Sequence, residues 1–152
     1  MGVSLKQKIE EDVKTSLKAG EVLKVSVLRM ALGAVHNREI QLLKKGSGLS
    51  DEEVLEVIRG EVKKRKDASE EFRKGGREDL VKKELEEAGI LGAYLPPEIS
   101  DEELERILKD GVREAGAAKA GDFGKVMKIV MPTLKGKASG DRISSNLKRL
   151  LG

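Results

Sequence analysis

The sequence predicts an all-α fold in two parts, an N-terminal domain of four helices followed by a small domain of three helices. Three observations lead to this prediction. Apolar residues recur at spacings of three and four along nearly every segment, whereas the alternation typical of strands does not rise above noise. Serine followed three residues later by Gln or Glu, the capping-box pattern of a helix start, opens three segments. Glycine or proline ends most of them.

The first four expected helices lie in the N-terminal 95 residues. Ser4 caps the first, and Gly20 ends it after an apolar stripe of i, i+4 spacing. The "GSG" stretch at 46–48 separates the second helix from the third. Because no strand precedes this stretch and no Gly-Lys-Ser/Thr follows it, we interpret it as a loop between helices rather than a phosphate-binding P-loop. The other three helices are expected at about Val22 to Lys45, Ser50 to about Lys74, and about Arg77 to Ala88.

Two consecutive prolines, Pro96 and Pro97, mark the expected boundary between the two parts. Proline cannot continue a helix, and it forces the preceding residue into an extended conformation. We therefore expect domains at residues 1–95 and 98–152. A domain of about 55 residues buries only ~60% of its chain surface and is marginally stable. The second domain is therefore expected to lean on the first or on a partner.

Three more helices are expected in the C-terminal part. Ser100 opens the first of them with a capping box. The second presents an apolar stripe over residues 123–134, and Pro132 is expected to kink it or end it early, because proline removes a hydrogen bond. Ser139 or Asp141 can start the last helix. Its apolar face comprises Ile143, Leu147, Leu150 and Leu151.

Charge is distributed unevenly along the chain. The whole sequence has 30 Lys and Arg against 27 Asp and Glu, a net charge of +3, which is too small to indicate a nucleic-acid partner by itself. Residues 96–115 carry three basic and seven acidic side chains, whereas residues 116–152 carry eight basic and two acidic ones. The positive charge is therefore concentrated in the last quarter of the chain. With only Phe72, Tyr94 and Phe123 as aromatic residues, a platform for base stacking is not expected.

No constellation of catalytic or metal-ligating residues is visible in the sequence. The chain has no cysteine, so thiol nucleophiles and thiolate metal sites are excluded. Its one histidine, His36, has no nearby partner, and the acidic clusters stand at helix starts, where the helix dipole favours them. We therefore expect no catalytic residue, no metal and no cofactor. Because neither a signal peptide nor a long apolar stretch is visible, we expect a soluble, cytoplasmic protein with no membrane partner.

The stretch "VMPTLKGKASGDR", residues 130–142, is the strongest candidate for a binding site. Its glycines are expected to let the backbone turn with positive φ and to allow close approach of a ligand. The amides that begin the next helix attract phosphate, and such a surface would contact an RNA backbone with little base specificity. The alternative is a helix-ending turn with ordinary surface lysines. The candidate residues for this phosphate contact are Lys125, Lys128, Lys135, Gly136, Lys137, Gly140, Arg142 and Arg149.

A second basic stretch, "VKKRKD" at residues 62–67, lies on the third expected helix. Acidic residues at spacings of three and four favour a solvated face with ion pairs here. A secondary anion-binding face is the alternative. Its residues would be Lys63, Lys64, Arg65 and Lys66.

Several motifs resemble those of the YqeY-like family. The family's successive signatures are similar to "VKKRKDASEEF" (62–72), "GREDLVKKELEE" (76–87) and "YLPPEIS" (94–100). The stretch "DFGKVMKIVMPTLKGKASGDRISSNLKRLL" (122–151) is similar both to the end of that family and to the tail domain of GatB, the B subunit of the glutamyl/aspartyl-tRNA amidotransferase. The resemblance covers nearly the whole chain, and it implies a helical front domain followed by a three-helix tail domain.

The resemblance also implies a function in the handling of tRNA. In the amidotransferase, a carbon–nitrogen ligase that uses glutamine as nitrogen donor, the tail domain helps to hold tRNA. The chemistry occurs in a kinase-like part and in a glutaminase subunit, and neither fits in 152 residues. We therefore expect a non-catalytic tRNA-binding protein that acts alone or beside the amidotransferase subunits. The alternative is a protein-interaction adaptor without nucleic-acid binding.

Overall fold

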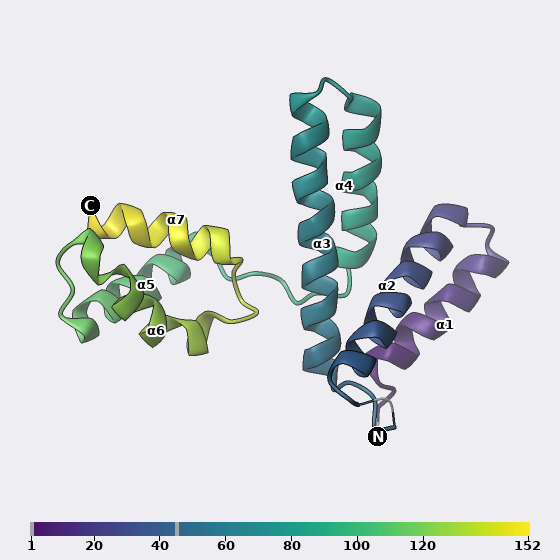
Figure 1. Ribbon diagram of the computed structural model, residues 1–152, viewed down its shortest axis with the longest axis horizontal. Coiled ribbons are helices and arrows are strands. Elements are labelled where there is room, and N and C mark those ends of the chain that lie inside the picture. The colour runs from purple at the N-terminus through teal and green to yellow at the C-terminus, as the bar shows by residue number, and fades with distance from the viewer. Residues whose placement is uncertain (1, 45) are drawn as a thin grey trace. The chain divides into compact units, whose positions relative to one another are not determined.

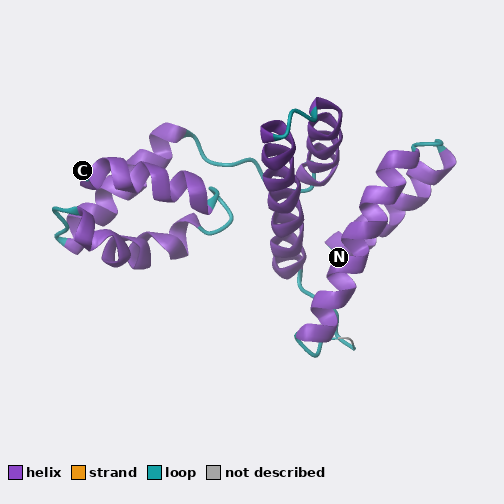
Figure 2. Cartoon of the chain, turned by 45° about the horizontal axis from the view of Figure 1, so that its top comes forward, coloured by secondary structure: helices purple, strands orange, loops and turns teal. Residues whose placement is uncertain are grey.

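The computed structural model describes residues 2–44 and 46–152, and helices are the only regular elements in them (Figure 1, Figure 2). The all-α prediction is confirmed. A short 3₁₀ turn, η1 (Ala120–Asp122), precedes the sixth helix. The α-helices are α1 (Leu5–Lys18), α2 (Val22–Gln41), α3 (Asp51–Lys74), α4 (Glu78–Gly92), α5 (Asp101–Ala115), α6 (Phe123–Leu134) and α7 (Gly140–Leu151).

Serine caps start α1, α3 and α5 where the sequence predicts them. At Ser4 and Ser50 the capping box is complete, because the serine hydroxyl accepts the N–H three residues on and that residue's side chain accepts the serine N–H. The Ser100 hydroxyl accepts the N–H of Glu103 at 3.2 Å, but the Glu103 carboxylate pairs with Arg106 at 3.1 Å. Each cap satisfies an amide that the first helical turn leaves without a carbonyl partner.

The ends of α2 and α4 differ from the expected ones. α2 ends at Gln41, and the expected end at Lys45 lies outside the described residues. α4 continues to Gly92 instead of stopping at Ala88, because its last turn carries Leu91, which is fully buried. Burial of a leucine contributes about 1.5–3 kcal/mol, which offsets the cost of about 1 kcal/mol for a glycine inside a helix.

Residues Met1–Leu95 form a compact unit, here called the front unit. Within it α1 packs against α2 and α3 packs against α4, as Figure 1 shows, and α2 contacts both α3 and α4. The Tyr94 hydroxyl donates a hydrogen bond to Asp12 of α1, which ties the end of this unit to its first helix. Burial, and then this bond, raise the pKa of Tyr94 above its ordinary value of 10.0. The aliphatic core includes Ile9, Val27, Leu28, Val35, Val54, Ile58 and Leu91.

Residues Pro96–Gly152 form a second unit, here called the tail unit, in which α5 packs against α6 and α7 (Figure 1). α6 contains Pro132 and ends at Leu134, so it spans the whole of the apolar stripe predicted over residues 123–134. α5 approaches α6 closely at Gly111, where a Cβ atom would lie 2.4 Å from Cγ1 of Val130. The core comprises Leu104, Leu108, Ala115, Val126, Val130, Leu134, Ile143, Leu147 and Leu151.

The two units meet in the sequence at Leu95 and Pro96, next to the expected boundary at Pro96 and Pro97. Each unit has a hydrophobic core of its own. Whether the predicted domains, residues 1–95 and 98–152, fold independently stays a prediction.

Replacing Gly111 by alanine is expected to destabilise the tail unit. Overpacking a core costs about 1–3 kcal/mol, and the gain of about 1 kcal/mol from alanine in a helix offsets only part of that cost. The matched control is Gly124→Ala in α6, where a Cβ atom would meet nothing within 4 Å. Urea unfolding of both variants checks the prediction, and a Gly111→Ala protein as stable as the Gly124→Ala protein would contradict it.

The carboxyl group of Glu53 is expected to titrate well below the usual range. A hydrogen bond from Lys44, at 2.8 Å, and one from the N–H of Ser50 lower the pKa of Glu53 from 4.5 to about 2. Because the folded-state pKa is depressed, this contact stabilises the fold above about pH 4.5, and the contribution is lost as the pH falls toward 2. Carboxyl ¹³C NMR titration measures it directly.

The Lys44→Met variant should move the Glu53 midpoint up toward 4.5. Lys74→Met serves as the control, because Lys74 pairs with Glu71 on the same helix. Equal Glu53 midpoints in the two variants would refute the assigned cause.

Candidate nucleic-acid interface

The turn between α6 and α7 carries the predicted binding stretch. The chain leaves α6 at Lys135, and Gly136 adopts φ +80°, a left-handed conformation that favours glycine. The N–H of Lys137 then donates to the carbonyl of Leu134 at 2.9 Å, which closes the turn. Gly140 was expected to supply positive φ as well, and this is wrong: Ser139 caps α7, so Gly140 is the first helical residue.

A backbone hydrogen bond joins this turn to the segment that leads into α5. The carbonyl of Lys137 accepts the N–H of Ile99 at 2.9 Å. The N–H of Ile99 lies just before the first residue of α5, so the bond joins two segments that are far apart in the sequence. The backbone of the turn is therefore held in place by a hydrogen bond from outside the turn.

Arg142 of α7 also binds the start of α5, where it donates hydrogen bonds to three acceptors. Its guanidinium lies 2.6 Å from Oε2 of Glu98, 2.7 Å from Oδ1 of Asp101 and 3.0 Å from the carbonyl oxygen of Ile99. The bond to Glu98, followed by the bond to Asp101, raises the pKa of Arg142 above its ordinary value. Both carboxylates neutralise this cation, so the geometry gives Arg142 a structural role. Its contact with a phosphate stays a prediction.

The remaining basic candidates in this region are the α6–α7 lysines, which are Lys125, Lys128, Lys135 and Lys137. All four are exposed. Lys125 and Lys128 lie three residues apart on α6, so they share a face away from the buried Val126. Within the described residues, no carboxylate forms an ion pair with Lys125, Lys128 or Lys137.

The cations of α5 contrast with these lysines, although they belong to the same unit. Arg106 pairs with Glu103, Lys109 with Glu105, and Arg113 with Asp110, at N–O distances of 3.1 to 3.4 Å. The positive charge of α5 is thus balanced on the helix itself. The positive charge of α6 faces solvent.

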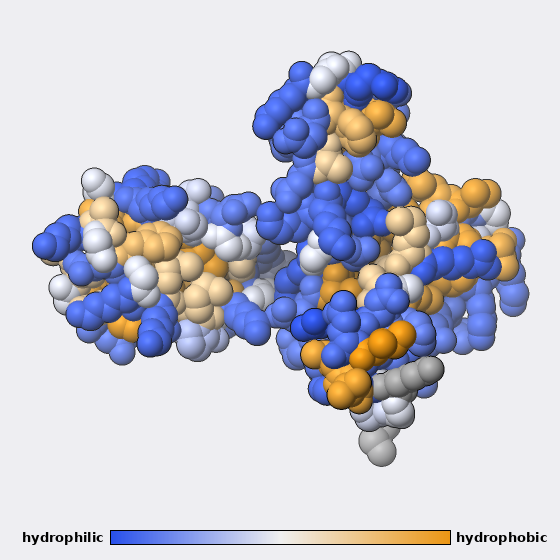
Figure 3. Space-filling model, viewed as in Figure 1, coloured by the Kyte–Doolittle hydropathy of each residue, from blue (hydrophilic) through white to orange (hydrophobic). Residues whose placement is uncertain are grey.

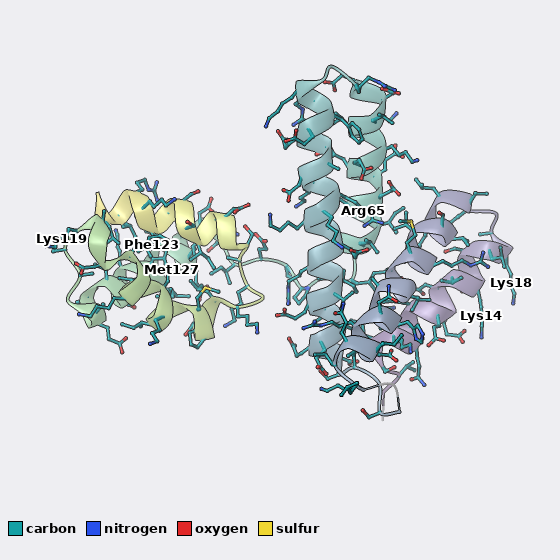
Figure 4. The ribbon with its side chains drawn as sticks, viewed as in Figure 1. Lys14, Lys18, Arg65, Lys119, Phe123 and Met127 are labelled. Atoms are coloured by element: carbon teal, nitrogen blue, oxygen red, sulfur yellow. The ribbon has the colours of Figure 1, made fainter. Side chains whose placement is uncertain are left out.

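Two basic residues near this surface were not singled out from the sequence. Nζ of Lys148, on α7, lies 5.9 Å from the ring centroid of Phe123 on α6, which is a cation–π contact. Lys119 precedes η1, which contacts α7, and Figure 4 shows Lys119 at the same end of the tail unit as Phe123. Arg149, which was predicted, is exposed and donates to Oδ1 of Asn146 at 2.9 Å. The contact between Lys148 and Phe123 spans a loop, so no helical spacing in the sequence could indicate it.

The second basic stretch on α3 is an ion-paired face. Lys63 pairs with Asp67 and Lys64 pairs with Glu61, both at 3.1 Å. Arg65 is buried and donates to the carbonyl oxygen of Glu61 at 3.1 Å (Figure 4). Lys66 is exposed. Burial removes Arg65 from the secondary anion-binding face that the sequence allowed.

Fold and surface together define a class, that of small all-helical proteins with an aliphatic front unit and a three-helix tail unit whose exposed lysines lie on α6 and the turn after it. The chain belongs to the YqeY-like family, because the family model described as "Yqey-like protein" matches residues 6–151.

Fungal relatives extend over most of the chain. The protein named "Altered inheritance of mitochondria protein 41, mitochondrial" from Saccharomyces cerevisiae is 28% identical over 132 residues, which cover 86% of this chain and 70% of the yeast protein. The protein of the same name from Vanderwaltozyma polyspora is 27% identical over 146 residues, covering 91% of this chain and 77% of that protein. The one from Pyrenophora tritici-repentis is 25% identical over 151 residues, covering 95% of this chain and 80% of that protein.

Among the described residues, no helix is both long enough and apolar enough to cross a membrane.

Replacing Arg142 by glutamine is expected to loosen α7 from the start of α5. The loss of two charged partners and one carbonyl acceptor should lower the free energy of unfolding by about 1–2 kcal/mol. The value is small because ion pairs at a partly exposed site contribute little beyond their hydrogen bonds. Amide hydrogen exchange in residues 140–151 measures this loss. Arg149→Gln is the control, since Arg149 donates to Asn146 of its own helix. Unchanged protection in Arg142→Gln would show that these contacts do not hold α7.

Proposed function

We propose that the protein binds tRNA without catalysing a reaction on it, and that the α6–α7 lysines contact backbone phosphates. The observation that carries this proposal is the contrast within the tail unit. Cations on α5 are paired with carboxylates of the same helix, whereas Lys125, Lys128 and Lys137 make no ion pair within the described residues. Exposed lysines without such a pair are available to neutralise phosphates and release counterions.

The chemistry of this surface favours phosphate over base recognition. Lysine is a flexible point charge that makes no bidentate contact with a base edge. Phe123, the aromatic ring of the tail unit, is partly buried and has Lys148 over its face. Phosphate contacts position an RNA without specifying its sequence. The proposed binding therefore depends on the shape and charge of tRNA rather than on an anticodon.

The proposal leaves the amide transfer chemistry to other proteins. Like the GatB tail domain, which this tail unit resembles in sequence, it would hold tRNA either alone or beside the amidotransferase subunits. We place this function in the cytoplasm, whereas the fungal relatives are named as mitochondrial proteins.

Charge reversal on α6 tests the proposal. The Lys125→Glu/Lys128→Glu variant should bind total tRNA at least about tenfold more weakly at about 0.1 M salt, because two phosphate contacts become repulsive. The slope of log affinity against log salt concentration should fall by about 1 for each lysine that no longer meets a phosphate. Fluorescence titration of labelled tRNA at several salt concentrations measures both quantities.

The matched control is Lys109→Glu/Arg113→Glu on α5, which makes the same change in net charge within the same unit. Both control cations are already ion-paired, so this variant should bind tRNA nearly as well as the unmodified chain does. If both variants lost the same amount of tRNA affinity, the loss would reflect the net charge of the protein and not a contact made by Lys125 and Lys128. No saturable binding of tRNA by the unmodified chain at low salt would remove the proposed function altogether.

A further inference from the structure

An open groove lies at the turn between α1 and α2 in the front unit. Its volume is about 510 Å³. Gly20, at φ +75°, lets the chain reverse between the two helices, so that side chains of both helices line the groove. The lining residues include Leu17, Val22, Val25, Ser26, Arg29 and Met30.

The apolar side chains of this groove are unusually exposed. Val22 is 80% exposed, Leu17 58% and Met30 54%, although each could be buried against a partner. Figure 3 shows hydrophobic side chains over the α1–α2 hairpin, surrounded by hydrophilic ones. Contiguous apolar surface of this kind on a charged protein marks an interaction site. Val22, Ser26 and Met30 follow one another at i, i+4 spacing, so they form a single line along α2.

The two helices that line the groove carry more basic than acidic side chains next to the turn, and the lining itself includes one of each, Arg29 and Glu21. Residues 14–30 contain four basic side chains and one acidic side chain, Glu21. Lys14 makes an exposed ion pair with Glu11 at 3.4 Å. Figure 4 shows Lys14 and Lys18 on the half of α1 that leads into the turn. Among the described residues, no carboxylate forms an ion pair with Lys18, Lys24 or Arg29.

We propose that this groove binds an amphipathic helix of a partner protein, with acidic residues beside its apolar anchors. Val22 and Met30 lie eight residues apart on α2, which corresponds to about 12 Å. That length accommodates roughly two turns of a helix, with apolar anchors at i, i+4 and i+7. The anchors cover Leu17, Val22 and Met30, and the acidic residues face the basic side chains around them.

Other occupants fit this groove less well. A second copy that docked through the same face would bring the basic side chains of the two α1–α2 hairpins together, and these would repel each other. A bilayer surface is flat, whereas the groove is concave and lined by two helices. RNA would satisfy the cations but would leave the apolar side chains uncovered. The proposal is independent of the tRNA surface, because the α6–α7 lysines belong to the tail unit.

A synthetic peptide tests this inference. The probe is an acetylated, amidated peptide of about 15 residues, with leucines at i, i+4 and i+7 and glutamates on either side of them. A second peptide has lysine in place of every glutamate. The full chain should bind the acidic peptide saturably and more weakly as salt rises, with ¹H–¹⁵N NMR shifts at Val22, Ser26 and Met30. The basic peptide should not bind.

The Val22→Asp/Met30→Asp variant should weaken binding of the acidic peptide by about tenfold or more. Both side chains are exposed, so the variant should unfold at the same temperature as the unmodified chain. The control is Leu85→Asp on α4, which changes a 42% exposed leucine outside the groove. The Lys125→Glu/Lys128→Glu variant should bind the peptide normally.

Four results would overturn the proposal: no saturable binding of the acidic peptide up to about 1 mM, equal binding of the two peptides, equal binding by the Val22→Asp/Met30→Asp variant, or NMR shifts outside the α1–α2 hairpin. A dimer seen by sedimentation equilibrium and abolished in that variant would assign the groove to a second copy instead. Binding of anionic phospholipid vesicles, but not of the peptide, would assign it to a membrane.

Discussion

Arg142 holds the two ends of the tail unit together. Its guanidinium bonds to Glu98, Asp101 and the carbonyl of Ile99, while the N–H of Ile99 bonds to the carbonyl of Lys137. A unit of this size has a small core, so its stability is marginal and contacts between its first and last helices add to it. Asp101 also lies in the first turn of α5, where the helix dipole favours a negative charge. The same carboxylate thus stabilises α5 and anchors α7.

The bonds of Arg142 to Glu98 and Asp101 separate it from the other basic residues of the tail unit. Arg142 is used inside the protein, and its charge is balanced by two carboxylates. Lys137 lies in the turn whose backbone is held by the bond to Ile99, and Lys125 and Lys128 extend from the helical backbone of α6. A fixed backbone under flexible lysine side chains suits the recognition of a phosphate chain, because it sets the spacing of the charges without requiring one exact geometry. In the proposed function, structural and binding roles therefore belong to different cations of one basic segment.

Local patterns in the sequence predicted most of the fold. Serine caps and helical periodicity located the helices. Contacts between distant segments were not predictable from those patterns. They include the ion pair of Arg142 with Glu98 and the cation–π contact of Lys148 with Phe123. The burial of Arg65 was not predictable either. A charged side chain looks the same in the sequence whether it faces solvent or a carboxylate forty residues away, so only the fold separates the two cases.

One measurement tests most directly the claim that the exposed lysines, and not Arg142, meet tRNA. It is a ¹H–¹⁵N NMR titration of the labelled full chain with tRNA, which follows backbone amides together with the guanidinium N–H signals of Arg142. The account predicts shifts at Lys125, Lys128 and Lys137, while the Arg142 signals keep their positions because that side chain stays bonded to Glu98 and Asp101. Large shifts of the Arg142 guanidinium, or shifts confined to the front unit, would contradict it.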